Sequence, residues 1–386
     1  MEPGLDCDVA VLGGGLAGLS LAVRLAGARD LRVVVLEPRA AYSRDRTWCY
    51  WHLLDHPFAE AVSARWSSWE VSRVHRGQRR TAVQSCPDMP YEMIPADRLY
   101  AAARAAIGRA SNVDLRLGCA VTGLVEEPRR VAVDTTGGRL FARYVFDSRP
   151  PPAGNGRGLV QRFLGQEVKA NRPVFDPGRA TLMDFAVRQR AGAVRFLYVL
   201  PTSPETALVE DTWLASADAV LPDHRLAIRD YLAERYGLDG YEVEFEEEGA
   251  IPMDPDLQAP RSTGRVLPIG TAGGAVKPSS GYAFLGIQRM TAALARDLLA
   301  GREPEPFRPR SDPLRWMDAV LLDAIAAAPE RAPELFGSLF EGCAPGPLVR
   351  FLNELGSAAD IGRVVAAMPK RPMMTAALRA STRASR

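Results

Sequence analysis

A glycine-rich turn near the start of the chain constrains the fold more than any other feature. Residues 8–12 read as a buried strand, residues 13–18 have the spacing Gly-x-Gly-x-x-Gly, and residues 19–25 have helical periodicity. A second apolar run follows at residues 31–36. This order predicts a βαβ unit of the Rossmann type and therefore an α/β fold.

The same unit predicts a dinucleotide site. Gly13, Gly15 and Gly18 let the backbone turn tightly and approach a pyrophosphate, while the helix N-terminus supplies free N–H groups and partial positive charge. Glu37 follows the second apolar run, where a carboxylate can accept a hydrogen bond from a ribose hydroxyl. A glycine-rich turn with a purely structural role would leave Glu37 unexplained.

A second glycine-rich region favours FAD over NAD. Residues 266–269 are strand-like and lead into a glycine-rich turn, after which residues 282–299 form a strongly apolar helical stretch. A second helix N-terminus directed at the cofactor suits a flavin, whose N1/C2=O edge becomes anionic on reduction. A structural loop is the alternative interpretation. The residues of this region that we expect near a flavin are Gly270, Thr271, Gly273 and Gly281.

Composition and charge exclude several classes of function. The 386 residues include 48 basic and 46 acidic side chains, a formal net charge of +2, which argues against a nucleic-acid partner held by bulk charge. Five scattered cysteines without a CxxC pair favour a reduced, cytoplasmic setting, and four histidines without ligand spacing argue against a metal site. Residues 9–28 are apolar but rich in glycine and preceded by acids, so we expect neither a signal peptide nor a membrane span there.

Two adjacent carboxylates, Glu210 and Asp211, interrupt an apolar, strand-like run at residues 207–213. Burial would raise the pKa of one carboxyl group, and the neighbouring negative charge would raise it further. Because adjacent strand residues point to opposite faces, we expect only one of the two to face a ligand. A solvated strand end is the alternative.

An aromatic cluster at Trp48, Tyr50 and Trp51 is a candidate wall of the ligand site. In an extended segment, alternation puts Trp48 and Tyr50 on one face. An ordinary aromatic core is the alternative. By contrast, the five glutamates of residues 242–248 are expected to form a solvated strand edge.

Taken together, these segments resemble the bacterial lycopene β-cyclases, flavoproteins related to the glutathione-reductase-like hydroxylases and geranylgeranyl reductases. Where hydroxylases of that group carry Asp-Gly and Gly-Asp, this sequence has Asp147 followed by serine and Gly270 followed by threonine, which favours a cyclase over a monooxygenase. The segments that carry the resemblance are residues 8–18, 45–51, 146–150, 161–165, 182–185, 196–201, 209–212, 249–253 and 269–282.

The resemblance implies a redox-neutral, acid/base cyclisation of the acyclic ψ ends of lycopene to β-ionone rings, giving γ-carotene and β-carotene. Reduced FAD would stabilise the carbocation, with NAD(P)H as electron donor. Glu210 matches the first carboxylate of the family signature and is the candidate catalytic acid, with Asp211 second. Trp48, Tyr50 and Trp51 would contact the substrate. The candidate cofactor-binding residues are Gly13, Gly15, Gly18, Glu37, Arg44, Asp147, Gly270, Thr271, Gly273 and Gly281.

Two other functions remain open from the sequence. An FAD-dependent monooxygenase or isoprenoid reductase would consume reductant in proportion to product. A non-catalytic flavoprotein would instead bind a polyene or dock onto a carotenoid-enzyme complex.

The motifs also predict the domain organisation. We expect a discontinuous FAD-binding domain, an inserted antiparallel-sheet substrate domain, and a helical C-terminal region. Their ranges are 1–60, 97–150 and 263–302 for the first, 61–96 and 151–262 for the second, and 306–386 for the third.

Because lycopene lies in the bilayer, we expect peripheral association with the inner face of the cell membrane. The tail at residues 361–386 mixes apolar and basic residues and contains no acid, which suits an anionic lipid surface. A disordered basic tail is the alternative. The cations in question are Lys370, Arg371, Arg379, Arg383 and Arg386.

Overall fold

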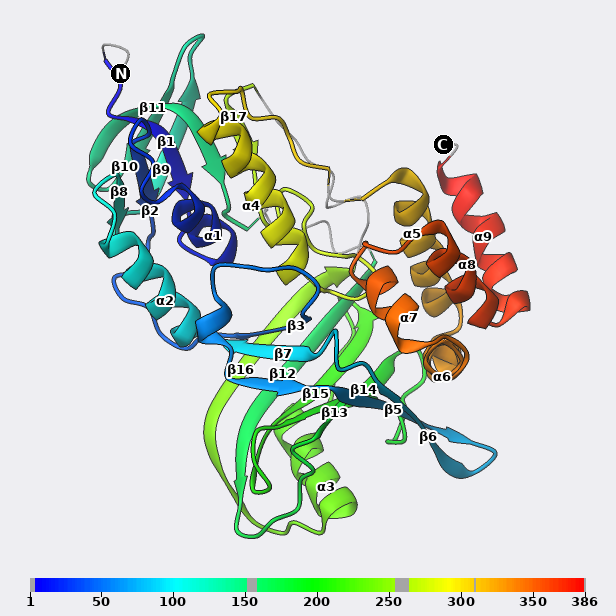
Figure 1. Cartoon of the computed structure of the whole chain (residues 1–386). Coiled ribbons are helices and arrows are strands. Elements are labelled where there is room, and N and C mark those ends of the chain that lie inside the picture. Colours follow the sequence, from blue (N-terminus) through cyan, green and yellow to red (C-terminus); the bar gives the residue numbers. More distant parts are fainter. Residues whose placement is uncertain (1–3, 151–157, 254–263, 309, 385–386) are drawn as a thin grey trace.

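The computed structural model describes residues 4–150, 158–253, 264–308 and 310–384. Its strands form three sheets, which we call A, B and C, and its helices pack on these sheets (Figure 1). Arg386 lies outside the described residues, as does the side chain of Arg383.

Sheet A is the Rossmann-like part of the molecule. Its strand order is β8-β2-β1-β11-β10-β9, and β17 pairs with β11. The neighbours β1, β2, β8, β11 and β17 are paired in parallel, whereas β9 and β10 join in antiparallel fashion. The strands are β1 (Cys7–Leu12), β2 (Val33–Leu36), β8 (Val113–Arg116), β9 (Val121–Glu126), β10 (Val131–Thr135), β11 (Gly138–Asp147) and β17 (Val266–Pro268).

The predicted βαβ unit is confirmed. All six residues of β1 are buried, as expected for a central parallel strand, and helix α1 (Leu16–Leu25) returns the chain to β2. Helices α2 (Ala96–Gly108) and α4 (Phe284–Leu299) share the apolar cluster of α1. The β17–α4 segment therefore returns to sheet A from far along the chain.

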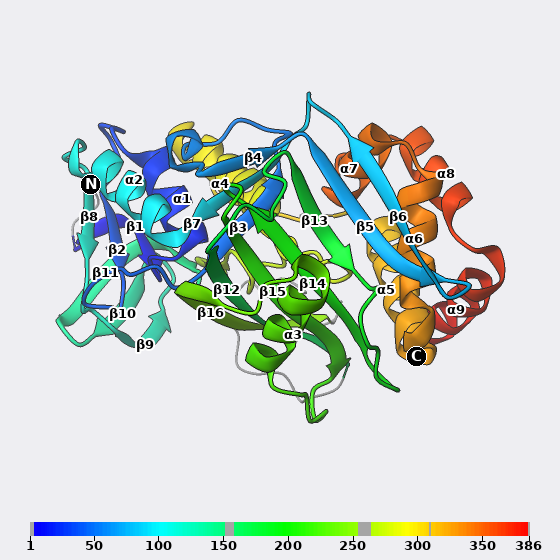
Figure 2. The ribbon, with the colours of Figure 1, turned by 90° about the horizontal axis from the view of Figure 1, so that it is seen from below.

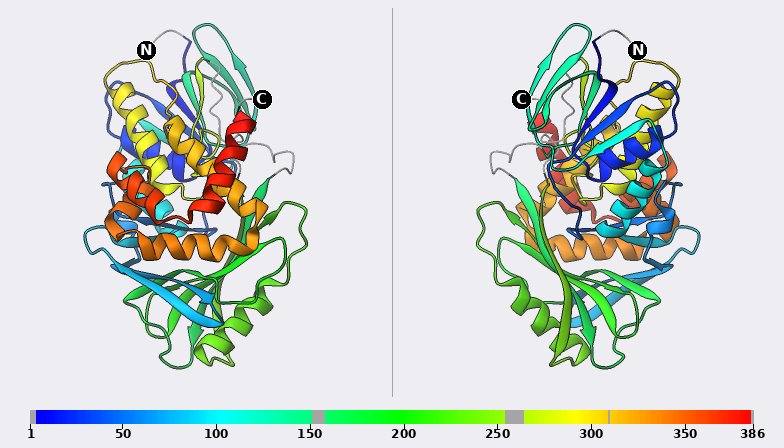
Figure 3. Two further views of the ribbon diagram at one scale, coloured as in Figure 1. Left: turned by 90° about the vertical axis from the view of Figure 1, so that its right-hand side faces the viewer. Right: turned by 90° about the vertical axis from the view of Figure 1, so that its left-hand side faces the viewer.

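Sheet C is a large, mostly antiparallel sheet with the order β16-β12-β15-β14-β13-β5-β6. Helix α3 (His224–Tyr236) covers one face, and the C-terminal helices lie on the other side of the sheet (Figures 2 and 3). The strands are β5 (Ser68–His75), β6 (Gln78–Ser85), β12 (Leu159–Ala170), β13 (Arg179–Asp184), β14 (Val194–Pro201), β15 (Thr206–Ser216) and β16 (Tyr241–Met253).

Sheet B connects the two larger sheets. It has the order β3-β7-β4, with β3 at Thr47–Trp51, β4 at Ala64–Trp66 and β7 at Tyr91–Pro95. The short 3₁₀ turn η1 (Ala59–Ala61) precedes β4. The domain boundary expected at residue 60 thus falls between strands of one sheet, and the division into domains stays a prediction.

The C-terminal region is helical and packs on the side of sheet C opposite α3, where its apolar residues share one cluster with the sheet. The tail expected to be a basic interfacial segment forms two helices, and Arg379 pairs with Asp323 of α5 at 2.6 Å. Within the described ranges, no helix has the length and hydropathy to span a bilayer. The elements are α5 (Asp312–Ala327), η3 (Pro329–Arg331), α6 (Ala332–Gly342), α7 (Pro345–Leu352), α8 (Ala358–Ala367) and α9 (Lys370–Ala384).

Candidate active site

One cavity of about 1410 Å³ reaches from the first glycine-rich turn, along one face of sheet C, to the C-terminal helices. A pocket for a single small ligand measures roughly 300–1,000 Å³. The cavity is therefore large enough for a dinucleotide at one end and a long apolar molecule at the other.

The dinucleotide end is built by the backbone around α1. Gly13 has a φ of 95°, and a Cβ there would lie 2.6 Å from the Ser148 hydroxyl, so this position requires glycine. Gly15 lines the cavity and has open space where a Cβ would be. It is the N-cap of α1, which has no side-chain cap and no acid in its first turn. This cradle fits a pyrophosphate, because free helix N–H groups and the helix dipole favour an anion.

Glu37 holds the same turn together. Its Oε2 accepts a 2.6 Å hydrogen bond from the Gly14 N–H, and Oε1 accepts from the backbone N–H and Nε of Arg39 at 2.9 and 2.8 Å. Although burial raises the pKa of Glu37, these hydrogen bonds outweigh it, and the pKa lies below its ordinary value. The ionised carboxylate borders the cavity and remains able to accept from a ribose hydroxyl.

The second glycine-rich region lies beside the first. Gly270 has a φ of 65°, and a Cβ there would come within 2.8 Å of the Ala17 Cβ. Thr271 and Gly281 line the cavity, and α4 starts at its edge without a side-chain cap. A second uncapped helix start thus meets the cavity.

Two of the predicted cofactor glycines have packing roles instead of facing the cavity. A Cβ on Gly18 would collide with the Gly13 carbonyl oxygen. One on Gly273 would lie 2.6 Å from the Pro268 carbonyl oxygen. Neither residue borders the cavity, so each allows close backbone packing behind the cradle.

Arg44 and Asp147 are also turned away from the cavity. Arg44 forms an ion pair with Glu167 and stacks over the Phe245 ring at 3.9 Å, because β12 and β16 approach its loop. Asp147 pairs with Arg149 at 2.7 Å. The arginines that line the cavity near the cradle are Arg39, Arg46 and Arg149.

The two adjacent carboxylates have opposite environments. Glu210 lines the cavity and accepts a 2.5 Å hydrogen bond from the Thr212 hydroxyl. Burial raises its pKa to about 8, against the Thr212 hydrogen bond, and the negative charges of Glu247 and Asp211 add to the rise. This raised pKa favours the protonated carboxyl group at neutral pH.

Asp211 lies on the opposite face of sheet C, toward α3. It is fully buried and accepts from Arg195 Nε at 2.6 Å, Trp213 Nε1 at 2.9 Å and His224 Nδ1 at 2.8 Å. Strand alternation separates it from the cavity, as expected for one of the pair. The structure thus corrects the catalytic assignment of Asp211.

Of the three predicted aromatic residues, Trp48 alone borders the cavity. Tyr50 shares its face of β3 but stacks on Phe284 with ring centroids 3.9 Å apart. Trp51 is fully buried on the other face, 4.7 Å from the Tyr91 ring. Tyr50 and Trp51 are therefore core residues behind the wall, which corrects their substrate-binding assignment.

The cavity around Glu210 is also lined by aromatic residues that the sequence did not predict. Tyr198 pairs directly with Glu210 across β14 and β15, and its hydroxyl lies 2.8 Å from that of Tyr91. Tyr282 and Phe163 also border this space. Their π faces suit a developing carbocation. Alternation in residues 194–200 could have predicted which face of the strand Tyr198 occupies. It could not have predicted that Glu210 is paired with Tyr198 on the next strand.

Glu247 is a further residue of the site that the sequence did not predict. The expectation of a solvated edge holds for the exposed Glu242 and Glu244, but Glu247 is buried and lines the cavity. It accepts from the Thr47 hydroxyl at 3.0 Å, and burial raises its pKa to about 7 against that hydrogen bond and the nearby arginines. Its two-residue spacing from the apolar Phe245 was the available signal.

The sequence matches the lycopene cyclase protein family over residues 8–378. The chain belongs to the lycopene cyclase family. It is 30% identical over 398 residues to a lycopene beta-cyclase of Paracoccus sp., and the alignment covers 96% of this chain and 96% of that protein.

The fold of this member of the lycopene cyclase family is similar to the folds of several solved structures. A geranylgeranyl bacteriochlorophyll reductase-like protein from Thermoplasma acidophilum has a TM-score of 0.66 at 13% identity, covering 96% of this chain and 98% of that one. An anhydrotetracycline hydroxylase from Streptomyces rimosus has a TM-score of 0.58 at 18% identity, covering 93% and 76%. The predicted α/β fold with its Rossmann-like unit and helical end is confirmed.

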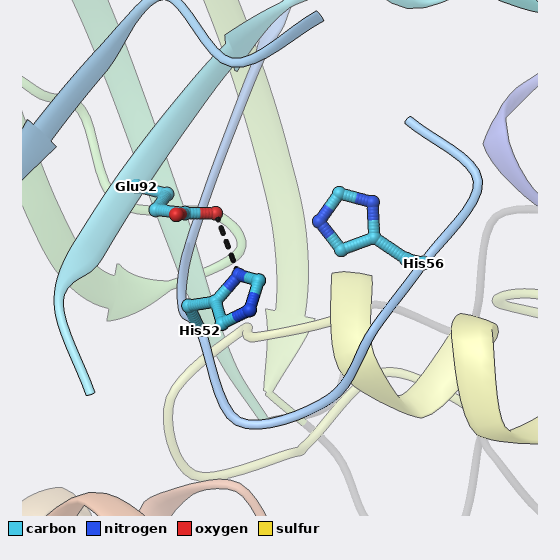
Figure 4. A group of neighbouring side chains, drawn as sticks. All are labelled: His52, His56 and Glu92. Atoms are coloured by element: carbon cyan, nitrogen blue, oxygen red, sulfur yellow. Dashed lines mark hydrogen bonds and ion pairs between the residues drawn. The ribbon is translucent and has the colours of Figure 1, made fainter. Parts of the chain in front are cut away.

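One group of side chains in the described part of this cyclase family chain has the composition of a metal site. The ligand atoms of His52, His56 and Glu92 lie within 4.8 Å of one another (Figure 4). Glu92 is already bonded to the Tyr50 hydroxyl at 2.8 Å, to His52 Nδ1 at 3.2 Å and to Arg65 Nε at 2.7 Å. Because the arginine supplies the counter-charge, we read the group as a hydrogen-bond network between β3 and β7.

Proposed function

We propose that the chain is a lycopene β-cyclase that converts the ψ ends of lycopene and related acyclic carotenoids to β-ionone rings. The reaction adds a proton to the terminal C=C bond and closes the ring by attack of a second C=C bond on the resulting tertiary cation. A proton then leaves a ring carbon to set the β double bond. Atoms and electrons balance without net redox chemistry, so the site must supply an acid, an anhydrous apolar space and electron-rich surfaces.

The observation that carries the proposal is one cavity containing a dinucleotide cradle, aromatic walls and the Glu210 carboxyl group, whose pKa is raised to about 8. Glu210 would donate the proton at the terminal C=C bond. Trp48 and Tyr198 would offer their ring faces to the cation. The apolar positions of β12, β14 and β15 that border the cavity would exclude water from the polyene.

FAD is the proposed cofactor, with NAD(P)H as its electron donor. The open position at Gly15, the uncapped start of α1 and the ionised Glu37 fit the pyrophosphate and ribose of a dinucleotide. Reduced FAD, when bound, supplies an electron-rich ring that stabilises positive charge in the substrate. Gly270, Thr271 and the start of α4 would border that ring.

The proposed working position is the inner, cytoplasmic face of the cell membrane. The cavity reaches α5, α8 and α9, where Trp316, Val365 and Met374 line it and are 42%, 51% and 67% exposed. Exposed apolar residues at a cavity mouth suit insertion into a lipid surface. Lys370 also borders this opening and would meet anionic head groups.

Pigment analysis of lycopene-accumulating cells that express the chain tests the function. We expect β-carotene or γ-carotene without an oxygen requirement. Oxygenated or saturated products would instead indicate a monooxygenase or reductase, and unchanged lycopene a non-catalytic polyene-binding flavoprotein.

A further inference from the structure

A glycine of β12, the strand between β15 and β16, lies between two glutamates that face the cavity. In the sheet register, Gly165 of β12 pairs with Glu210 of β15 on one side and with Glu247 of β16 on the other. Directly paired residues point to the same face, so all three positions face the cavity. Two strand spacings separate the glutamates, about 10 Å between their backbones.

Gly165 places no side chain between the two glutamates, and the other close neighbour is Leu208, whose Cδ1 lies 3.4 Å from where a Cβ would be. A Cβ at this position would lie 3.4 Å from Cγ of Glu247 and 3.7 Å from Cβ of Glu210. The stems of both glutamates therefore flank the same point above Gly165, and a branched side chain there would project between their carboxyl groups.

The surroundings of the two carboxyl groups differ. Arg44, Arg46 and Asp45 act on Glu247, and the Thr47 hydroxyl donates to it. Glu210 has Thr212 as its donor, and the charges of Glu247 and Asp211 act on it. The uncharged Cys49, Tyr91, Tyr198 and Tyr282 complete the wall. Burial raises both pKa values, to about 8 for Glu210 and about 7 for Glu247. The Thr47 hydroxyl and the arginine charges favour the carboxylate form of Glu247, whereas the charges of Glu247 and Asp211 favour the protonated form of Glu210.

We propose that Glu247 is the second catalytic carboxyl group of the cyclisation, receiving the ring proton while Glu210 donates the first. This inference rests on the proposed function. The Glu210 O–H bond breaks as a C–H bond forms at the terminal C=C bond. After ring closure, a ring C–H bond breaks, its electron pair forms the β double bond, and the proton passes to the Glu247 carboxylate.

The turnover leaves each group in the other's starting state. Glu210 is then ionised and Glu247 protonated, and one proton must return across the space above Gly165. No oxidant or reductant is consumed. Gly165 thus has a role of its own, because a branched side chain there would block this return.

The test uses the full chain with FAD, reduced by NADPH, and lycopene in liposomes. We expect Glu247→Gln to form β rings at least about a hundredfold more slowly, the scale of general acid–base catalysis. Glu247→Asp, which keeps a carboxyl group, should retain part of the rate. Glu244→Gln is the matched control, since Glu244 is exposed on the same strand and pairs with Lys169 at 3.6 Å.

The pH profile separates a catalytic from a structural role. Wild-type kcat/KM should be bell-shaped, rising as Glu247 ionises and falling as Glu210 does, with apparent pKa values that belong to the pair. Residual activity of Glu247→Gln should lack the acidic limb. Its products should include ring isomers in which a different carbon has lost the proton.

A pair of substitutions at Gly165 provides an independent arm. Alanine makes only ordinary contacts there, so Gly165→Ala should keep most activity, whereas Gly165→Val should lose it with flavin binding and melting temperature unchanged. A wild-type rate and pH profile in Glu247→Gln, or full activity in Gly165→Val, would overturn this inference and leave the cyclase function standing. Absence of rings with the wild-type chain would overturn both.

Discussion

Glu210 and Asp211 are neighbours in sequence, and the sheet sends them to opposite sides. Glu210 faces the cavity and has one donor, the Thr212 hydroxyl. Asp211 faces α3 and is bonded to the side chains of Arg195, Trp213 and His224. A carboxyl group with few donors stays protonated and can act as an acid. One bonded to several donors from β14, β15 and α3 holds those elements together.

Replacing Glu210 by glutamine should abolish ring formation. Glutamine keeps the size and polarity of the protonated acid but cannot release a proton to a C=C bond, so a loss of about 10²-fold or more is expected. Flavin absorbance of the purified variant should match the wild type, because the cradle is distant along the cavity. Wild-type amounts of β-carotene from this variant would contradict the assigned role.

Asp211→Asn should destabilise the protein instead. Removing one partner from a buried ion pair leaves Arg195 without its counter-charge, which costs roughly 3–5 kcal/mol. Urea unfolding measures this difference, with Asp230→Asn as control because Asp230 pairs with Arg229 on the exposed face of α3. Folded Asp211→Asn protein should keep its activity per flavin. An unchanged unfolding midpoint together with lost activity would return Asp211 to the site.

At the scale of elements, the start of α1 is the part of the molecule with the clearest ligand function. The chain supplies neither a capping side chain nor an acid there, so the first helix N–H groups depend on a ligand or water. The same arrangement recurs at α4, whose start meets the cavity beside the first.

Gly15→Ala should weaken dinucleotide binding without unfolding the chain. The methyl group meets no protein atom within 4 Å and the backbone φ of −82° suits alanine, yet it occupies the approach of the pyrophosphate. Losing one charged hydrogen bond costs roughly 1.5–3 kcal/mol, which corresponds to about ten- to a hundredfold in Kd. Titration of the apoprotein with FAD measures this.

Gly108→Ala is the matched control for that titration. Gly108 ends α2, is exposed and likewise meets nothing within 4 Å. Its FAD affinity should equal that of the wild type. Equal affinity in Gly15→Ala as well would remove the cradle from the cofactor site.

At the scale of the whole molecule, the cavity joins the Rossmann-like part, sheet C and the C-terminal helices. Its exposed apolar mouth at α5, α8 and α9 lies at the end remote from the cradle. Ala376 and Ala380 of α9 are buried against the core, so deleting this helix would disturb the fold as well as any lipid contact. Surface substitutions on α9 keep that packing.

Met374→Glu combined with Leu378→Glu should release the protein from anionic liposomes. The two side chains are 67% and 72% exposed, one helical turn apart. Each change removes apolar contact with lipid and adds a repelled charge worth about 1 kcal/mol, so binding should fall at least about tenfold in co-sedimentation. The control, Val83→Glu with Val125→Glu, makes the same change of charge on strands β6 and β9 and should bind as the wild type does.

The sequence alone determined the features that depend on short-range geometry. The βαβ unit follows from apolar runs and from glycines whose backbone turns are sterically required, as at Gly13. The opposite orientation of Glu210 and Asp211 follows from the two-residue repeat of a strand. The family resemblance rests on segments spread along the chain.

Only the tertiary structure decided which faces meet. Strand alternation does not say which face is the cavity, so it left Glu210 and Asp211 equivalent until β15 was paired and α3 was placed. Arg44 does not border the cofactor end of the cavity, because its side chain contacts Glu167 and Phe245, which are far along the chain. Glu247 belongs to the candidate site because it is buried at the cavity and is paired with Gly165 of the neighbouring strand. These properties depend on long-range register and burial, which no local stretch of sequence contains.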